Sequence, residues 1–333
     1  MSGRDSAVAA LYGLAIGDAL GMPTQLMARA VIADRYGVLE TFEPADADHP
    51  LAAGMPAGSI TDDTEQALLL ARLLVEGDGH VGAEKFALAL VAWEDGMRAK
   101  GSLDLLGPST KRAVEAVIAG ESVAESGRFG TTNGAAMRVT PVGIAVDSTD
   151  LNALVDRVVE ASSVSHNTGV AIAGASAVAA AVSAGIDGAN LREAIELGAA
   201  AASIGATRGY WVAAADVAAR IRWAVSLADP ADPERSLTRI YELVGTSLAT
   251  QESVPAAFGI LATYPDEPWR VVLAAASLGG DSDTVAAMAG AIAGSVHGSM
   301  HGSGAFPADA RSFVARVNSL DLESVADRLL ALR

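Results

Sequence analysis

Apolar residues recur along the chain with the three-to-four-residue spacing of amphipathic helices, and glycine or proline ends most of these stretches. No long stretch alternates apolar and polar residues as a half-buried strand does. The segments between the helical stretches carry glycine, proline and acidic clusters, and none is long or biased enough to be an interdomain linker. The pattern predicts helices over residues 6–20, 64–76, 82–100, 109–119, 133–146, 151–163, 167–184, 191–205, 213–227, 236–246, 253–262, 267–277, 283–296 and 307–332.

The composition favours the same fold class. Apolar residues make up 51% of the 333 residues but aromatic residues only 5%, so Ala, Val, Leu and Ile must fill the core, as they do between closely packed helices. The apolar stretch at residues 170–186 is rich in Ala, Ser and Gly, which is typical of a buried helix rather than a membrane span. We therefore expect an all-α protein with a single compact domain over residues 1–333.

Charge and cysteine content narrow the function classes. The net charge of -17 opposes binding to a nucleic-acid backbone or to an anionic membrane surface. The absence of cysteine excludes disulfides and thiolate metal sites. Because the first residues lack the apolar core of a signal peptide, we expect a cytoplasmic protein with neither a nucleic acid nor a membrane as partner. The oligomeric state is left open.

Two acidic motifs stand at the start of predicted helices. Asp62 and Asp63 lie in SITDDTEQALLLARLL, and Asp281 and Asp283 lie in SLGGDSDTVAAMAGAIAG. Helix capping is the simpler interpretation of either motif alone, but one carboxylate suffices for a cap. The extra carboxylates repel one another unless a cation neutralises them. Together the two motifs favour a site for hard divalent cations, which prefer carboxylate, hydroxyl and water oxygens.

Five motifs resemble the ADP-ribosylglycohydrolase family, in the family's order and over nearly the whole chain. They are GLAIGDALGMPTQ (residues 13–25), GSITDDTEQALLLARLL (58–74), GRFGTTNGAAMRVTPVGIA (127–145), SHNTGVAIAGASAVA (165–179) and LGGDSDTVAAMAGAIAGSVHG (278–298). The family includes the dinitrogenase reductase-activating glycohydrolases, and the resemblance implies an all-α orthogonal helical bundle. It also implies a glycosidase that uses a binuclear metal centre and an activated water to cleave the bond at C1 of the distal ribose of ADP-ribosylated substrates.

The resemblance further implies roles for individual residues. The expected ligands of two Mg²⁺ ions, or of Mn²⁺ in their place, are Thr61, Asp62, Asp63, Asp281, Asp283 and Thr284. The expected catalytic residues are Asp62, Asp63 and Asp283. The expected partner is ADP-ribose, an ADP-ribosylated protein or a small riboside, and the residues that bind it are Gln25, Gly130, Thr131, Asn133 and His166.

Several residues outside the acidic motifs also have a purely structural interpretation. Without the resemblance, a lone histidine such as His166 is more often a structural hydrogen-bonding group than a catalyst. Asp18 is expected to be a buried hydrogen-bonding residue that supports the site. Tyr210, Trp211 and Trp223 follow a helical spacing and are expected in the core.

The chain departs from the family pattern at Gln25, where many members carry a glutamate that approaches the scissile ribose. An amide cannot take up a proton at neutral pH, so a water held by the metals would have to rely on Asp62 or Asp63. Two enzyme hypotheses stay open: hydrolysis of ADP-ribosylated substrates, and hydrolysis of a smaller N-riboside. A catalytically silent ADP-ribose-binding protein is a third hypothesis, and the presence of all six expected ligands argues against it.

Overall fold

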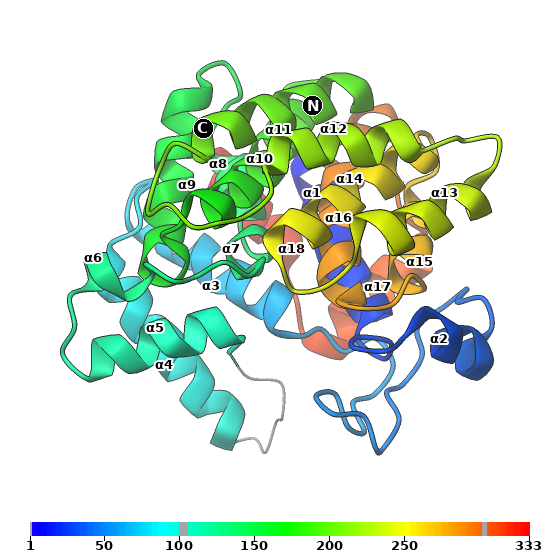
Figure 1. Cartoon of the computed structure of the whole chain (residues 1–333), viewed down its shortest axis with the longest axis horizontal. Helices are drawn as coiled ribbons and strands as arrows, with labels where there is room; N and C mark the ends of the chain where they lie inside the picture. The colour runs from blue at the N-terminus through cyan, green and yellow to red at the C-terminus, as the bar shows by residue number, and fades with distance from the viewer. Residues whose placement is uncertain (1, 100–105, 302–304) are drawn as a thin grey trace.

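The computed structural model describes residues 2–99, 106–301 and 305–333. Within these residues the secondary structure is helical and there is no β-strand, which confirms the expected all-α fold class (Figure 1). The elements are α1 (Ser2–Gly21), α2 (Arg29–Tyr36), α3 (Asp62–Glu76), α4 (Ala83–Ala99), α5 (Pro108–Ile118), α6 (Val123–Ser126), α7 (Gly134–Met137), α8 (Thr140–Ala145), α9 (Leu151–His166), α10 (Gly169–Ile186), α11 (Leu191–Gly205), α12 (Val217–Leu227), α13 (Pro233–Arg239), the π-helical turn η1 (Ile240–Val244), α14 (Thr250–Thr263), α15 (Pro268–Ala276), α16 (Ser282–His301), α17 (Ala308–Asn318) and α18 (Leu322–Leu330).

The structure corrects two of the predicted helices and adds two others. Residues 133–146 form α7 and α8 rather than one helix, because Pro141 has no N–H to donate to the carbonyl one turn before it. Residues 307–332 form α17 and α18, separated by Ser319, which adopts a left-handed conformation with φ 54°. The hydrophobic pattern predicts neither α2 nor α6, which are short.

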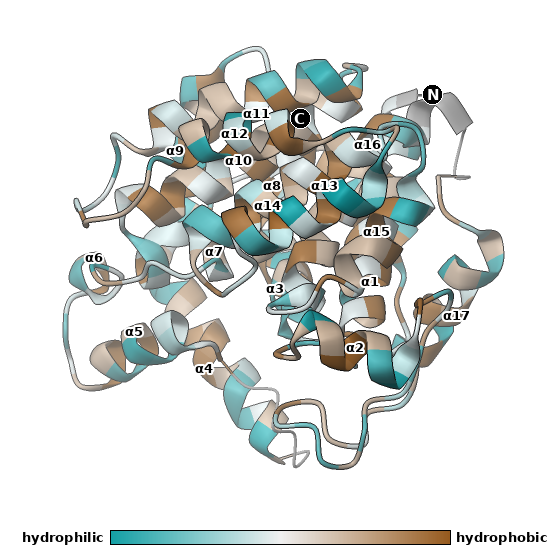
Figure 2. Cartoon of the chain, turned by 45° about the vertical axis from the view of Figure 1, so that its right-hand side comes forward, coloured by the Kyte–Doolittle hydropathy of each residue, from teal (hydrophilic) through white to brown (hydrophobic). Residues whose placement is uncertain are grey.

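The helix at the centre of the fold is α10. All 18 of its residues are buried, and it packs against α8, α9, α11 and α16. By length and composition it is the one described helix that is apolar enough to cross a membrane, yet its whole length lies inside the protein. Outer helices such as α4 and α5 instead carry both hydrophobic and hydrophilic residues (Figure 2). One connected cluster of buried apolar side chains extends from Ala7 to Leu329, and the single-domain organisation stays a prediction.

Glycines on α1 and α16 let these two helices touch backbone to backbone, side by side at the middle of the molecule (Figure 1). A Cβ atom at Gly13 would lie 2.0 Å from the carbonyl oxygen of Gly290, and one at Gly17 would lie 2.1 Å from another carbonyl oxygen of α16. The contact ends at Gly21, where a Cβ would lie 2.3 Å from the Cα of Asp283. No side chain fits at these positions, so the contact fixes where α16 begins relative to α1.

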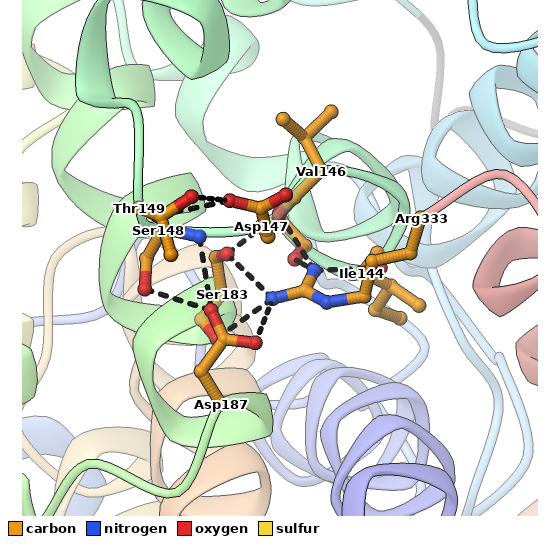
Figure 3. Close-up of polar contacts among 9 residues, drawn as sticks. Ile144, Val146, Asp147, Ser148, Thr149, Ser183, Asp187 and Arg333 are labelled. Carbon is orange, nitrogen blue, oxygen red and sulfur yellow. Dashed lines mark hydrogen bonds and ion pairs between the residues drawn. The ribbon is translucent and has the colours of Figure 1, made fainter.

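Arg333 fastens the end of the chain to the carboxyl ends of α8 and α10 (Figure 3). Its guanidinium donates to the backbone oxygens of Ile144 at 3.0 Å and Val146 at 2.6 Å, and to the carboxylate of Asp187 at 2.6 Å. A cation is stabilising at helix carboxyl ends because carbonyl groups there lack intrahelical donors. Arg333 therefore adds donors for the carbonyl oxygens at these helix ends, of which that of Val146 also accepts from the hydroxyl of Ser183 at 2.6 Å.

The aromatic prediction is wrong for two residues. Trp211 is 87% exposed, and Trp223 is 39% exposed with the guanidinium of Arg220 5.3 Å from its ring centroid. The helical spacing was misleading because α12 begins only after its cap, Asp216. Trp211 consequently lies in the irregular segment 206–216, and Trp223 lies on the outer face of α12.

The replacement Gly290→Ala is expected to lower the free energy of unfolding by roughly 3 kcal/mol or more, because the new methyl group would collide with backbone that cannot yield. Its matched control is Gly96→Ala in α4, where a Cβ would meet nothing within 4 Å. The control is expected to stabilise the helix by about 0.5–1 kcal/mol. Urea unfolding measures both variants, and equal effects of the two substitutions would contradict the close α1–α16 contact.

Candidate active site

The first acidic motif is held in place by a carboxylate from α1. Asp18 is fully buried and accepts hydrogen bonds from the backbone N–H and the hydroxyl of Thr61, at 3.0 and 2.8 Å. It also accepts from the backbone N–H and the hydroxyl of Thr64, at 3.1 and 2.5 Å. Asp18, a buried hydrogen-bonding residue as expected, thus binds the start of α3 together with the cap Thr61. The carboxylates of Asp62 and Asp63 are not needed for that purpose.

The second acidic motif meets the first through side-chain hydrogen bonds. The hydroxyl of Thr284 donates to both carboxylate oxygens of Asp63 at 3.1 Å, although the two residues are 221 positions apart. The amide of Asn133, the cap of α7, donates to Asp281 at 2.5 Å. The starts of α3, α7 and α16 therefore converge at one place.

A pocket of about 210 Å³ opens at this convergence. It lies between the segment around Gln25 and the start of α5. The lining residues are Gln25, Leu26, Leu51, Asp62, Leu106, Gly107, Pro108, Thr110, Thr132, Asn133, Gly134, Met137, Leu248, Asp281, Asp283 and Thr284. Carboxylates, hydroxyls and two amides thus share the pocket with leucine, proline and methionine side chains.

Three carboxylates of the two motifs, those of Asp63, Asp281 and Asp283, are buried close to one another, whereas Asp62 is half-buried. Burial raises the pKa of Asp281 to about 6, although hydrogen bonds from Asn133 and Thr284 oppose the shift. Burial, and then repulsion from Asp281, raises the pKa of Asp283 well above its usual range. Burial also raises the pKa of Asp63, and repulsion from Asp283 adds to the shift. The site as it stands is short of positive charge.

The donor set fits a divalent cation. One carboxylate oxygen of Asp283 is buried and has no hydrogen-bond donor in the part of the chain that the structure describes. A buried anionic oxygen without a partner is costly, and a cation is the group that best satisfies it. Among the described side chains, however, no three of His, Asp or Glu already stand in a geometry that would hold one ion. The metal ligands therefore stay a prediction.

Gln25 is positioned by the loop that follows α2. Its backbone oxygen accepts from the Nε2 atom of His49 at 3.0 Å. The Nδ1 atom of His49 accepts from the backbone N–H groups of Leu51 and Ala52 at 3.2 and 2.8 Å, so the ring is neutral with its proton on Nε2. Burial lowers the pKa of His49, which favours the same state. The amide nitrogen of Gln25 is buried and has no acceptor among the described residues, so it is a donor available to a ligand.

The pocket brings together only part of the expected substrate-binding set. Gln25 and Asn133 line it, whereas Gly130, Thr131 and His166 do not. Gly130 is pressed against the end of α9, where a Cβ would lie 2.0 Å from a carbonyl oxygen. The backbone oxygen of Thr131 accepts from α14. The roles of these three residues in binding stay predictions.

The sequence analysis did not single out Thr132 or Thr110, and both residues line the pocket. Thr132 is half-buried, and its hydroxyl lies 2.9 Å from the Nε2 atom of His166. It stands between two residues that the GTTNG stretch did single out, so only the side-chain direction in the folded chain distinguishes it from Thr131. His166 reaches the pocket through this hydroxyl rather than directly.

Comparisons with known proteins agree with the fold and the motifs. A family model described as ADP-ribosylglycohydrolase matches residues 1–333. The uncharacterized protein YegU of Escherichia coli (strain K12) is 34% identical over 325 residues, which cover 97% of this chain and 96% of that protein. An uncharacterized protein of Archaeoglobus fulgidus is 33% identical over 288 residues, 84% of each protein.

Two further matches are more partial or more distant. The ADP-ribosyl-[dinitrogen reductase] glycohydrolase of Rhodospirillum rubrum is 32% identical over 151 residues, 43% of this chain and 45% of that enzyme. A solved structure described as an ADP-ribosylglycohydrolase-related protein complex has the same fold, with a TM-score of 0.71, 23% identity and 99% of both chains covered. Since the family model spans every residue and two relatives match over most of their lengths, the chain belongs to the ADP-ribosylglycohydrolase family.

Proposed function

We propose that the protein is a divalent-metal-dependent hydrolase that cleaves the glycosidic bond at C1 of the distal ribose in an ADP-ribosylated protein side chain or small molecule. Membership of the family supports hydrolysis of ADP-ribosyl substrates. The observation that carries the metal dependence is the meeting of Asp62, Asp281 and Asp283 around one pocket. The buried oxygen of Asp283 without a donor among the described residues adds to it.

The chemistry divides between the ions and the side chains. When bound, two Mg²⁺ or Mn²⁺ ions supply Lewis acidity that orients water and the ribose hydroxyls. We assign their binding to Thr61, Asp62, Asp63, Asp281, Asp283 and Thr284. Hydrolysis adds the hydroxyl of water to C1 and gives a proton to the leaving group, and we assign the transient uptake of that proton to Asp62, Asp63 or Asp283. The negative side chains also stabilise the positive charge that develops at C1.

A smaller N-riboside is the second candidate substrate. Of the described residues that line the pocket, none is Lys, Arg or His, the side chains that most often bind a pyrophosphate. The pocket volume of about 210 Å³ is also at the small end for a ligand site. The unpaired amide donor of Gln25 favours an uncharged acceptor, such as a hydroxyl of the sugar or a carbonyl oxygen of a base.

Divalent cations are expected to raise the midpoint of thermal unfolding of metal-free protein by several degrees. A ligand at about 100 times its Kd adds about 2.7 kcal/mol to the stability of the folded state. The rise is expected to be larger at pH 8 than at pH 5.5. The pKa of Asp281 is raised to about 6, so at pH 5.5 the folded metal-free protein holds a proton there that competes with the cation. As the pH rises through 6 this proton is lost, and the metal-free protein becomes less stable because the unfolded chain binds fewer protons in that range.

The replacement Asp283→Asn is expected to remove most of the cation-induced rise, because it removes one charge from the cluster. It should also stabilise the metal-free protein at pH 8, since it relieves a buried repulsion. The matched control is Asp34→Asn, which changes an exposed carboxylate of α2. An equal cation-induced rise in both variants, measured by differential scanning fluorimetry, would contradict a metal site at Asp283.

Turnover with Mg²⁺ is expected for either an ADP-ribosylated amino acid or a plain N-riboside, measured as release of the free sugar by chromatography. The compounds to compare are ADP-ribosyl-arginine, ADP-ribosyl-serine and a set of nucleosides. Asp283→Asn is expected to lower kcat by roughly 10²- to 10⁴-fold, the usual effect of removing a group that handles the proton. Asp34→Asn should leave it unchanged.

The outcomes of this comparison separate the hypotheses. Turnover of nucleosides alone would replace the first substrate class by the second. Tight calorimetric binding of ADP-ribose with no turnover of any compound would indicate a catalytically silent binding protein. Full activity in the presence of excess chelator would refute the metal dependence.

A further inference from the structure

Arg138 is the largest fully buried side chain, and no step proposed above uses it. It follows α7, and its guanidinium lies 4.9 Å from the ring centroid of Phe86. Burial lowers the pKa of Arg138 to about 10, so the group stays charged at neutral pH. No carboxylate lies within ion-pair distance of it in the described part of the chain. Its guanidinium instead donates to two neutral side chains, those of Ser165 and Gln66, and from each of them further hydrogen bonds connect to the pocket.

The first route runs from Arg138 to Thr132 and has a fixed direction. Nη2 of Arg138 donates to the hydroxyl of Ser165 at 2.6 Å. A guanidinium only donates, and Nδ1 of His166, 2.8 Å away, is the one acceptor that the Ser165 hydroxyl meets among the described residues, so Ser165 turns its own hydrogen toward Nδ1. Nδ1 then accepts, so the neutral ring carries its proton on Nε2 and donates it to the hydroxyl oxygen of Thr132 at 2.9 Å.

The second route runs from Arg138 to Asp62. Nη1 of Arg138 donates to the amide oxygen of Gln66 at 2.9 Å, which fixes the orientation of that amide. The amide nitrogen of Gln66 consequently points to Asp62 and donates to its Oδ2 atom at 2.7 Å. Arg138 therefore orients groups at two points of the pocket lining, Asp62 and Thr132.

We propose that Arg138 is a positioning residue that acts through Ser165 and His166 to present the hydroxyl of Thr132 to the pocket as a hydrogen-bond donor, and that Thr132 binds an acceptor oxygen of the ribosyl substrate. Thr132 already accepts from His166, so its own hydrogen is left for the ligand. The recognition by Thr132 rests on the proposed function, whereas the direction of the route does not.

The same direction distinguishes this arrangement from a nucleophile and its base. A hydroxyl beside a histidine is the usual pairing in covalent catalysis, but there the histidine nitrogen accepts the hydroxyl proton. In this protein the Nε2 atom of His166 is the donor, since the hydroxyl of Ser165 occupies Nδ1. Burial lowers the pKa of His166 well below its usual range, which keeps the ring neutral. Thr132 is thus a binding group and not an attacking one.

The direction is tested by ¹⁵N NMR of protein labelled at its histidines, at pH 7 and without substrate. The His166 ring, identified by the signals lost in His166→Gln, is expected to show an unprotonated Nδ1 and a protonated Nε2. The replacement Ser165→Ala removes the donor at Nδ1, so the Nδ1 signal is expected to shift. The matched control is Ser162→Ala, one turn earlier on α9, whose buried hydroxyl has no partner among the described residues.

A proton on Nδ1 of His166 in the unmodified protein would overturn the direction, and so would an unchanged Nδ1 signal in folded Ser165→Ala. The unmodified protein decides the first point alone, so the failure of a variant to fold does not affect it. The Ser162→Ala spectrum is expected to match that of the unmodified protein at His166.

The recognition by Thr132 is tested with Thr132→Val and Thr132→Ser, titrated calorimetrically with ADP-ribose and with a nucleoside in the presence of Mg²⁺. Loss of the hydroxyl in Thr132→Val is expected to weaken binding roughly three- to tenfold, the usual effect of one neutral hydrogen bond. Thr132→Ser, which keeps the hydroxyl, is expected to stay within about twofold of the unmodified protein. Equal binding by all three proteins would overturn the recognition. If the unmodified protein binds neither compound, the proposed function fails and this recognition fails with it, while the NMR result still decides the direction.

Discussion

The candidate site depends on the direct backbone contact between α1 and α16. The glycines of that contact leave no room for adjustment, and the contact ends where Gly21 meets Asp283. The same α1 carries Asp18, one turn before its end, and Asp18 binds the first turn of α3. One helix therefore sets the position of both acidic motifs, the first through a hydrogen-bonded carboxylate and the second through close packing. A shift of α16 along α1 would separate Thr284 from Asp63.

This arrangement places charge where an apolar core would be more stable. Asp18, Asp63, Asp281 and Asp283 are each at most 4% exposed, and the hydrogen bonds they accept offset only part of the cost of burial. Burial of apolar side chains stabilises the fold against this cost, since the buried apolar cluster extends through nearly the whole chain. The polar atoms without partners are informative for this reason. Of those in the described residues, the amide of Gln25 and one oxygen of Asp283 belong to residues that line the pocket.

The sequence predicted the helical fold better than it predicted the geometry of the candidate site. The low aromatic content and the helical period were sufficient for the fold class, and the spacing of Asp62, Asp63, Asp281 and Asp283 was sufficient to single out the two motifs. The exposure of Trp211 was mispredicted, because periodicity does not reveal where an irregular segment interrupts it. The sequence singled out Thr131, whereas its neighbour Thr132 lines the pocket, and the role of Thr131 in binding stays a prediction. The two adjacent residues are both threonine, so only the tertiary structure decides which of them lines the pocket.

Hydrogen-bond direction adds information that neither the sequence nor the heavy-atom distances carry by themselves. The distance between Thr132 and His166 is compatible with a histidine that accepts a proton and with one that donates it. The ambiguity is resolved two residues away, because the hydroxyl of Ser165 accepts from Arg138 and meets no acceptor among the described residues other than Nδ1 of His166, which leaves the ring proton on Nε2. A buried arginine with no carboxylate at ion-pair distance among the described residues is expensive to hold in a core. Its place at the origin of both routes gives a physical reason for the chain to keep it there, since a lysine offers no planar pair of donors to reach Gln66 and Ser165 at once.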